Sequence, residues 1–431
     1  MALFVLPMEA ERLNGTNGGL WVGIYLAVCG ATQVVCPIAG KLSDRHASRH
    51  GRRRPFMVVG TAVTILAFFG MRVASMMLWS KAYLFFLFSA EVALNFVYSA
   101  QCGLPADLQA TQNGKSKEDD DGANGIISGY IALHSFLGSI AAMSMIYLTR
   151  TNTVQVEYPI YIAALAIACF IVCTSVKEES SEHLGKHGWR SLSWQELAKA
   201  FMIDLDEDLD FFWVCAGRCF YYISTSSVVF LYYYIRDMIK VGHESSVRSH
   251  LASLVVFAQL VGAVCSVPCS HLSNKIGRKV VIYIANLLMG MTFVLYTIAP
   301  KCGDLAWGVV LAAGFCFGVG SGAYLSVDYA LALDCLPAGK TAAEAFGLWG
   351  VAGFVGSTVG PLVGGFMLSA TLPGGPINDD DVHLKRWPSV PGHVVEEYPF
   401  IGYAAVLLIT GSAMNIVVAF LTSKIRASSV R

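Results

Sequence analysis

The chain has 431 residues, of which 55% are hydrophobic and only 14% are charged, whereas soluble domains carry about a quarter charged residues, so this composition excludes an ordinary water-soluble protein. The formal net charge is zero, with thirty basic and thirty acidic residues, so no overall positive field points to a nucleic-acid partner. The twelve cysteines form no CxxC pair and no cluster with histidine, which favours a packing role over disulfides or a metal site.

Apolar runs of about 20 residues recur along the whole chain, and each is long enough to cross a hydrocarbon layer about 30 Å thick as a helix. A backbone in lipid must satisfy its own hydrogen bonds, and these runs lack the strict alternation of barrel strands. We therefore expect an all-α membrane protein with about eleven spans. In chain order, the predicted spans are 19–41, 55–76, 82–105, 125–148, 158–176, 211–235, 249–270, 279–299, 305–328, 343–370 and 398–422.

The longest polar stretch, from Lys177 to Asp210, separates five predicted spans from six. A membrane protein built from two helical bundles commonly carries its central linker at such a place. We expect an N-terminal helical bundle at 1–176, a cytoplasmic linker at 177–210 and a C-terminal helical bundle at 211–431.

The distribution of positive charge predicts the orientation. Loops on the side that holds Lys41 to Arg54 and the C-terminal tail carry nineteen Lys and Arg residues, against ten on the other side. The positive-inside rule places this richer side, and with it the C-terminus, in the cytoplasm. The plasma membrane is the default location, because no sorting signal is evident.

An internal repeat relates the two halves of the chain. The segment GKLSDRHASRHGRRRP, from Gly40 to Pro55, is echoed by SHLSNKIGRK, from Ser270 to Lys279, and each is a polar turn between two predicted spans. The offset is about half the chain, as a duplicated bundle would give. The second copy follows two spans after the linker, but the first follows only one span from the start. We interpret this difference as a missing first helix, with the opening MALFVLP as its remnant.

The first copy resembles the signature loop between the second and third helices of the major facilitator superfamily, which reads Gly-x-Leu-x-Asp-Arg followed by Gly-Arg-Arg/Lys. Its three-residue insertion and the run GRRRPF resemble the branch of plant sucrose carriers and related glycoside and animal sugar symporters. Three stretches are similar to the fourth, seventh and tenth helices of that branch: AEVALNFVYSAQCGLPADL from Ala90, GRCFYYISTSSVVFLYYYIRD from Gly217 and GSGAYLSVDYALALDCLPAG from Gly320. The resemblance implies two pseudo-symmetric helical bundles with about 11 transmembrane helices, twelve minus the first.

The resemblance also implies that the repeated turn is a gate, which breaks and reforms as the bundles rock. A small residue such as Gly40 allows close helix approach, and Asp44 can accept hydrogen bonds from a helix N-terminus or an arginine. We expect the arginines to hold the loop at anionic headgroups. Asn274 replaces Asp44 in the second copy, so that latch should be weaker; the alternative for the whole motif is a basic loop that only sets topology. The predicted gating residues are Gly40, Asp44, Arg45, Gly51, Arg52, Arg53, Asp107, Gly277 and Arg278.

Glu91 is the first candidate for proton coupling. A carboxylate in the middle of an apolar helix is costly when ionised, so burial favours a group that can load and release a proton. Glu91, Asn95, Tyr98 and Cys102 are spaced by four, three and four residues and share one helical stripe. The resemblance implies proton coupling at this position, which is an Asp in plant sucrose carriers. The alternative is a glutamate that pairs with a neighbouring helix for packing alone.

Arg218 is the main candidate for solute binding. A buried guanidinium needs a partner, and the available intramembrane carboxylates are Glu91 and Asp328. Tyr221 and Tyr222 share its stripe, and tyrosine rings can stack on the apolar faces of a sugar. The alternative is a structural ion pair.

The remaining candidates are weaker. Cys102 stands where plant sucrose carriers have an arginine, so the guanidinium fork for two sugar hydroxyls is absent and sucrose itself is in question. His134 could relay protons or serve as a hydrogen-bonded histidine at a helix interface. The predicted proton-coupling residues are Glu91, Asp328 and His134. The predicted substrate-binding residues are Asn95, Tyr98, Arg218, Tyr221, Tyr222 and Gln259.

Several other functions lack their motifs. The run AGKT at Ala338 lacks the first glycine of a phosphate loop, which disfavours a nucleotide site and a primary pump, and no HExxH or nucleophile elbow points to an enzyme. We expect no cofactor, and as partners the lipid bilayer, protons and a sugar-like solute. The leading hypothesis is a proton-coupled symporter working by alternating access. The alternatives are a carrier of an amino acid, organic anion or vitamin, and a non-transporting sensor or scaffold.

Overall fold

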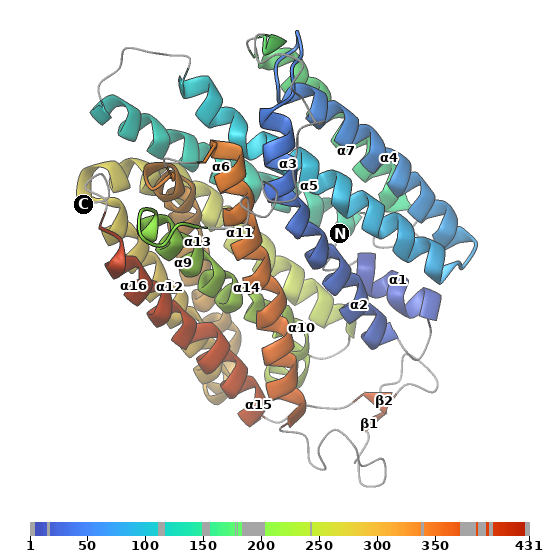
Figure 1. Cartoon of the computed structure of the whole chain (residues 1–431). Helices are drawn as coiled ribbons and strands as arrows, with labels where there is room; N and C mark the ends of the chain where they lie inside the picture. The colour runs from blue at the N-terminus through green and yellow to red at the C-terminus, as the bar shows by residue number, and fades with distance from the viewer. Residues whose placement is uncertain are drawn as a thin grey trace. The chain divides into compact units, whose positions relative to one another are not determined.

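The computed structural model describes residues 5–14, 18–110, 117–148, 156–176, 178, 180–182, 203–241, 244–337, 340–370, 385–386, 394–395 and 400–426. These residues are almost entirely helical (Figure 1). The first half holds α1 Val5–Asn14, α2 Gly18–Ala31, η2 Thr32–Val34, α3 Val35–Asp44, α4 Arg54–Met76, α5 Ser80–Ala110, α6 Lys117–Leu148 and α7 Glu157–Ser175.

The second half begins at the end of the predicted linker, most of which lies outside the described residues. Its helices are α9 Leu209–Ser226, η6 Ser227–Phe230, α10 Leu231–Tyr234, η7 Ile235–Ile239, α11 Glu244–Ile276, α12 Arg278–Ile298, η8 Ala299–Lys301, η9 Gly303–Leu305, α13 Ala306–Asp334, α14 Ala342–Ala370, α15 Phe400–Ala405, η11 Val406–Ala413 and α16 Met414–Lys424. Two short strands, β1 Lys385–Arg386 and β2 Val394–Val395, pair antiparallel.

Among the described residues, ten helical stretches are long and apolar enough to cross a membrane. Each coincides with one of the eleven predicted spans, so the prediction of a multi-pass all-α membrane protein is confirmed. The remaining prediction, 211–235, is helical too, but it is built from α9, a 3₁₀ turn, the short α10 and the start of the π-helix η7.

Helix α4 illustrates how local sequence makes a span. Pro55 lies in its first turn, where a missing backbone N–H costs nothing. Its packing face carries Gly60 and Gly70, where a Cβ atom would come within 2.6 Å of Val97 and 2.5 Å of Phe86 in α5. The two helices lie side by side (Figure 1), and α5 side chains pack closely against the two glycines of α4.

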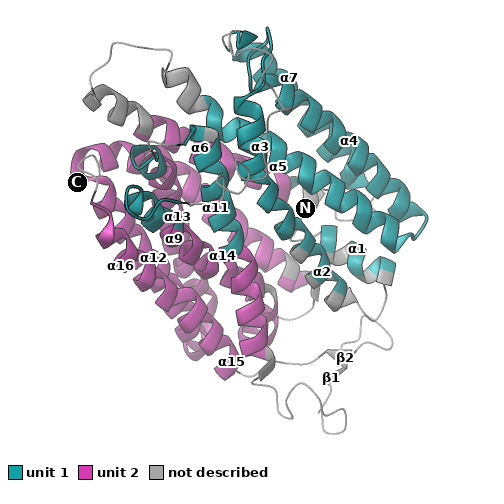
Figure 2. Cartoon of the chain, in the orientation of Figure 1, with its two compact units in different colours: residues 1–124, 144–215, 331–355 teal, residues 125–143, 216–330, 356–431 magenta. Residues whose placement is uncertain are grey.

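The chain divides into two compact units, each discontinuous in sequence (Figure 2). Unit 1 comprises residues 1–124, 144–215 and 331–355, and unit 2 comprises residues 125–143, 216–330 and 356–431. The predicted division into bundles at 1–176 and 211–431 stays a prediction.

Each unit has its own apolar core. In unit 1, α1 contributes to a buried cluster with α2, α4, α5 and α7, formed by Val5, Leu6, Ala10, Tyr25, Ala67, Phe68, Met71, Ala74, Tyr83, Leu87, Ala90 and Tyr158. In unit 2, the largest described cluster joins Leu231, Tyr234, Ile235, Val247, Leu254, Phe293, Tyr296, Ala299, Val310, Ala313, Leu368, Tyr403, Val406 and Leu407.

Candidate functional site

The repeated turn has the same backbone shape in both copies. Gly51 precedes α4 with φ +89°, and Gly277 precedes α12 with φ +95°. Residues with a Cβ atom rarely adopt a positive φ, whereas glycine, which has none, adopts it without penalty. Both glycines thus allow the same backbone conformation in the turn before a helix, which agrees with the predicted internal repeat.

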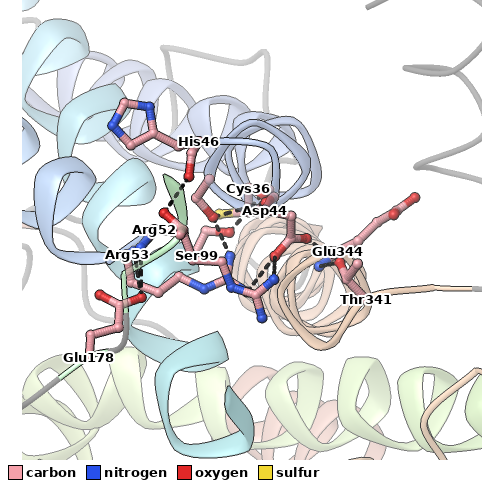
Figure 3. A network of polar contacts seen from close by, with 12 residues as sticks. Cys36, Asp44, His46, Arg52, Arg53, Ser99, Glu178, Thr341 and Glu344 are labelled. Carbon is pink, nitrogen blue, oxygen red and sulfur yellow. Dashed lines mark hydrogen bonds and ion pairs between the residues drawn. The ribbon is translucent and has the colours of Figure 1, made fainter. Parts of the chain in front are cut away.

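Asp44 is the centre of a polar network at the end of α3 (Figure 3). One carboxylate oxygen forms an ion pair with Arg53, which also donates to the Ser43 hydroxyl, and the Arg52 guanidinium lies 4.0 Å away. The other oxygen accepts a hydrogen bond from the Thr341 hydroxyl. Asp44 is 9% exposed and Arg53 is 0% exposed. Of the two alternatives predicted for this aspartate, the arginine is present, and the second partner is the side-chain hydroxyl of Thr341, just before α14.

The position of Arg53 corrects one expectation. We expected the loop arginines to lie at lipid headgroups, but the Arg53 side chain is fully buried against Asp44 and Ser43. A buried guanidinium is stable only when it is paired, and here the aspartate supplies the opposite charge.

Thr341 caps the N-terminus of α14. Its hydroxyl oxygen accepts from the backbone N–H of Glu344 at 3.3 Å, and the Glu344 carboxylate lies 3.3 Å from Lys340 and 3.6 Å from Lys41 of α3. Thr341 and Glu344 were not predicted as site residues, although Thr-x-x-Glu before an apolar run is a capping-box signal. An acidic group at a helix N-terminus also complements the helix dipole.

For the other predicted gating residues, the structure gives mainly their burial. Gly40 and Arg278 are buried, and the Gly40 carbonyl accepts from the Ser43 hydroxyl at 2.9 Å. Arg45 is half-buried at the end of α3. The side chain of Asp107 lies outside the described residues.

Glu91 is half-buried in α5 and hydrogen-bonds with the Cys29 thiol of α2. One turn later, Asn95 is 7% exposed. Its amide donates to the Thr32 hydroxyl at 3.0 Å and accepts from the Cys36 thiol at 3.4 Å. The predicted stripe on α5 therefore faces α2, η2 and α3, and Asn95 already has partners there.

Tyr98, in the same stripe, approaches α14. Tyr98 and Cys102 are half-buried, and a Cβ atom on Gly350 would lie 3.3 Å from the Tyr98 ring. Nearby, a Cβ atom on Gly347 would meet the backbone of Pro37 at 2.6 Å. Glycine is thus required where α14 crosses α3.

Arg218 is paired with Asp328, so one of its two predicted partners is confirmed. The pair joins α9 to α13 within unit 2, and the two residues are 6% and 3% exposed. The guanidinium also donates to the Tyr222 hydroxyl at 3.3 Å and lies 4.8 Å from the centre of its ring. Tyr221 stacks on Tyr324 with ring centres 3.6 Å apart.

Two weaker candidates are not brought to this pair by any described contact. His134 is exposed on α6, and its ring Nδ1 lies 2.7 Å from the Tyr130 carbonyl of its own helix. Gln259 is half-buried on α11.

A second buried acid in unit 2 was not predicted. Asp237 in η7 is 2% exposed, and it accepts from the Tyr403 hydroxyl at 2.6 Å and from the neighbouring Arg236 at 2.5 Å. Its position at the end of a long apolar run gave no signal in the sequence of a contact with Tyr403, because that partner lies 166 residues away.

Residues 214–423 match the family model described as Major Facilitator Superfamily. No curated protein is similar enough in sequence to count as a match. Among solved structures, a bacterial homologue of the iron transporter ferroportin in the outward-facing state aligns with a TM-score of 0.67 at 13% identity, covering 98% of this chain and 94% of that chain. A variant of the E. coli fucose:proton symporter FucP aligns with a TM-score of 0.59 at 14% identity, covering 99% and 97%. The nucleoside transporter NupG aligns with a TM-score of 0.58 at 14% identity, covering 98% and 95%. The chain is therefore an all-α membrane protein with the major facilitator fold.

Proposed function

We propose that the chain is a secondary transporter that couples the movement of a neutral, sugar-like solute to protons. It would work by alternating access, exposing its solute first to one side of the membrane and then to the other. The major facilitator fold does not by itself define a function. The chemistry of transport must therefore come from the residues of the site.

The observation that carries the proposal is the placement of Glu91. Its carboxyl group lies in α5, inside the span Ser80–Leu104, half-buried and beside the Cys29 thiol. No arginine or lysine is a described partner of this carboxyl group. A membrane carboxyl group without a fixed counter-ion is stabilised by taking up a proton, and a proton that can be lost again can be coupled to transport.

The Arg218–Asp328 pair supports a neutral solute. The positive and negative charges of the pair cancel within unit 2, so an anionic solute would have to displace Asp328 from the guanidinium. Tyrosines 221, 222 and 324 around the pair offer aromatic faces and hydroxyl groups, which suit a molecule with apolar ring faces and several hydroxyls. Fucose and nucleosides, the solutes in the names of two structural neighbours, have this chemistry.

The test is uptake by the full-length protein in proteoliposomes with an imposed pH gradient. The probes are radiolabelled mono- and disaccharides, with a nucleoside, an amino acid and an organic anion for comparison. We expect accumulation of one sugar-like probe that depends on the gradient. Accumulation that ignores the gradient would contradict proton coupling, and uptake of no probe at all would favour a sensor or scaffold.

Glu91→Gln separates coupling from solute binding. Glutamine imitates the protonated carboxyl group, so the variant should lose gradient-driven accumulation but still exchange labelled for unlabelled solute across the membrane. The matched control is Glu182→Gln, which changes an exposed carboxylate outside the spans and should behave like the wild type. Unchanged coupling in Glu91→Gln would sink the assignment.

A further inference from the structure

We propose that Glu178 positions the gate loop, residues 45–53, so that Arg53 meets Asp44, and that Glu178 and Ser181, which follow α7, are thereby part of the gate. The description of this loop as a gate rests on the function proposed above, whereas the contacts that hold it do not. Glu178 carries no role in the sequence motif and lies more than 120 residues beyond the loop.

The Glu178 carboxylate accepts three consecutive backbone N–H groups. One oxygen accepts from Arg52 at 2.9 Å and from Arg53 at 2.8 Å, and the other accepts from Arg54 at 3.1 Å (Figure 3). Helix α4 begins at Arg54, and the first N–H groups of a helix have no acceptor within it. A carboxylate at this place satisfies them with charge-assisted bonds and complements the helix dipole.

Ser181 holds the other side of the loop. Its backbone N–H donates to the Ser48 carbonyl at 3.0 Å, and its hydroxyl accepts from the Ser48 N–H at 2.9 Å and donates to the His46 carbonyl at 2.9 Å. Ser181 is 4% exposed. Glu178 and Ser181 therefore hold the gate loop at both of its ends.

Gly51 leaves the room that the carboxylate occupies. A Cβ atom at this position would lie 2.3 Å from the Glu178 carboxyl carbon, and the glycine has φ +89°. A larger residue would need an unfavourable backbone and would push the carboxylate away from the N–H groups. The glycine of the motif is thus matched to an acid from a distant part of the chain.

The consequence concerns the arginine side chains. Glu178 binds the backbone of Arg53 and not its guanidinium group, so the guanidinium remains available to pair with Asp44. Because Asp44 in turn accepts from Thr341 at the start of α14, Glu178 acts on that contact through Arg53. Glu178 is a positioning residue that need not touch any solute.

Hydrogen–deuterium exchange of the full-length protein in lipid nanodiscs tests the proposal without any solute. In Glu178→Ala, the amides of residues 52–54 should exchange about tenfold faster or more, because all three lose a charged acceptor. The amide of Glu344, which donates to Thr341, should also exchange faster. The control Glu182→Ala removes an exposed carboxylate four residues away and should change neither region.

Unchanged exchange at residues 52–54 would overturn the proposal. Faster exchange there without any change at Glu344 would also overturn it, because Glu178 would then be a helix cap with no effect on the gate. If Glu178→Ala does not fold, Glu178→Gln decides: its amide keeps one acceptor oxygen, so at least one of the three N–H groups should lose protection, and protection of all three would count against the idea. A wild-type protein that moves no solute would refute the transport function while leaving this exchange pattern intact.

Discussion

The ion pair between Arg218 and Asp328 offers the sharpest test of the energetics of unit 2. Both side chains are more than nine-tenths buried, so removing one partner leaves the other charge in apolar surroundings. Such a loss costs about 3–5 kcal/mol, and about 3 kcal/mol is roughly 150-fold in the unfolding equilibrium. Arg218→Gln should cost about 0.5–1 kcal/mol more than Asp328→Asn, because it also removes the contact with the Tyr222 ring.

The assay is chemical unfolding in detergent micelles for the wild type, the two single variants and the double variant. Removing both charges leaves no unpaired ion, so the double variant should be less destabilised than the sum of the single variants by about 2 kcal/mol or more. Costs that add within about 0.5 kcal/mol would refute the reasoning, because they would show that the two charges do not depend on each other.

The double variant also separates the two interpretations of the Arg218 pair. If Arg218→Gln with Asp328→Asn is folded and still accumulates the solute that the wild type carries, the pair is structural. If it is folded but inactive in both accumulation and exchange, the pair contributes to solute binding. We expect the second result, because Tyr222 contacts the guanidinium and the stacked rings of Tyr221 and Tyr324 lie beside Tyr222, and these groups suit a sugar.

Three further outcomes can be checked by unfolding measurements. Thr341→Val should lower the unfolding free energy by about 1–2 kcal/mol, because it removes a helix cap and a hydrogen bond, and Thr341→Ser should restore most of it. Gly51→Ala should cost about 1–3 kcal/mol and more than Gly303→Ala, because both have positive φ but only Gly51 faces Glu178, while a Cβ atom at Gly303 meets open space; equal costs would exclude the steric part. Burial raises the pKa of Glu9 in α1, outside the ten candidate spans, above 4.5, so the folded state binds this proton more tightly than the unfolded state. The unfolding free energy should therefore fall as pH rises from 4.5 through the raised pKa, and Glu9→Gln should remove that fall.

Apolar runs predicted the spans well, because the requirement for a long hydrophobic helix is local. The exception is the predicted span 211–235, where the structure changes to a 3₁₀ turn at Ser227–Phe230. Just before the turn, the hydroxyls of Thr225 and Ser226 donate to backbone carbonyls three residues earlier. Such side-chain bonds compete with regular helical ones, so the run of serine and threonine residues, and not its hydrophobicity, held the relevant signal.

The network around Asp44 could be predicted only in part. The motif predicted Asp44 and an arginine partner for it, because a carboxylate at the end of a helix that leads into an arginine-rich loop has basic groups within reach. The identities of Thr341 and Glu178 depend on tertiary contacts 297 and about 125 residues away in sequence, which periodicity and spacing cannot supply. The burial of Arg53 was missed for the same reason, since a loop arginine looks solvent-exposed until its partners are known.

The two copies of the repeated turn share a backbone but differ in chemistry. Gly51 and Gly277 adopt nearly the same positive φ, so the duplicated sequence has kept the shape of the turn in both halves. Asp44 is buried in an ionic network, whereas Asn274 is exposed on α11, where its side chain lies against Gly125 of α6. An amide carries no net charge, so it can neither pair ionically with an arginine nor gain fully from a helix dipole. The turn therefore has a similar glycine conformation in both copies, but only the first copy has an acid at this position, and Glu178 and Ser181 contact that first copy.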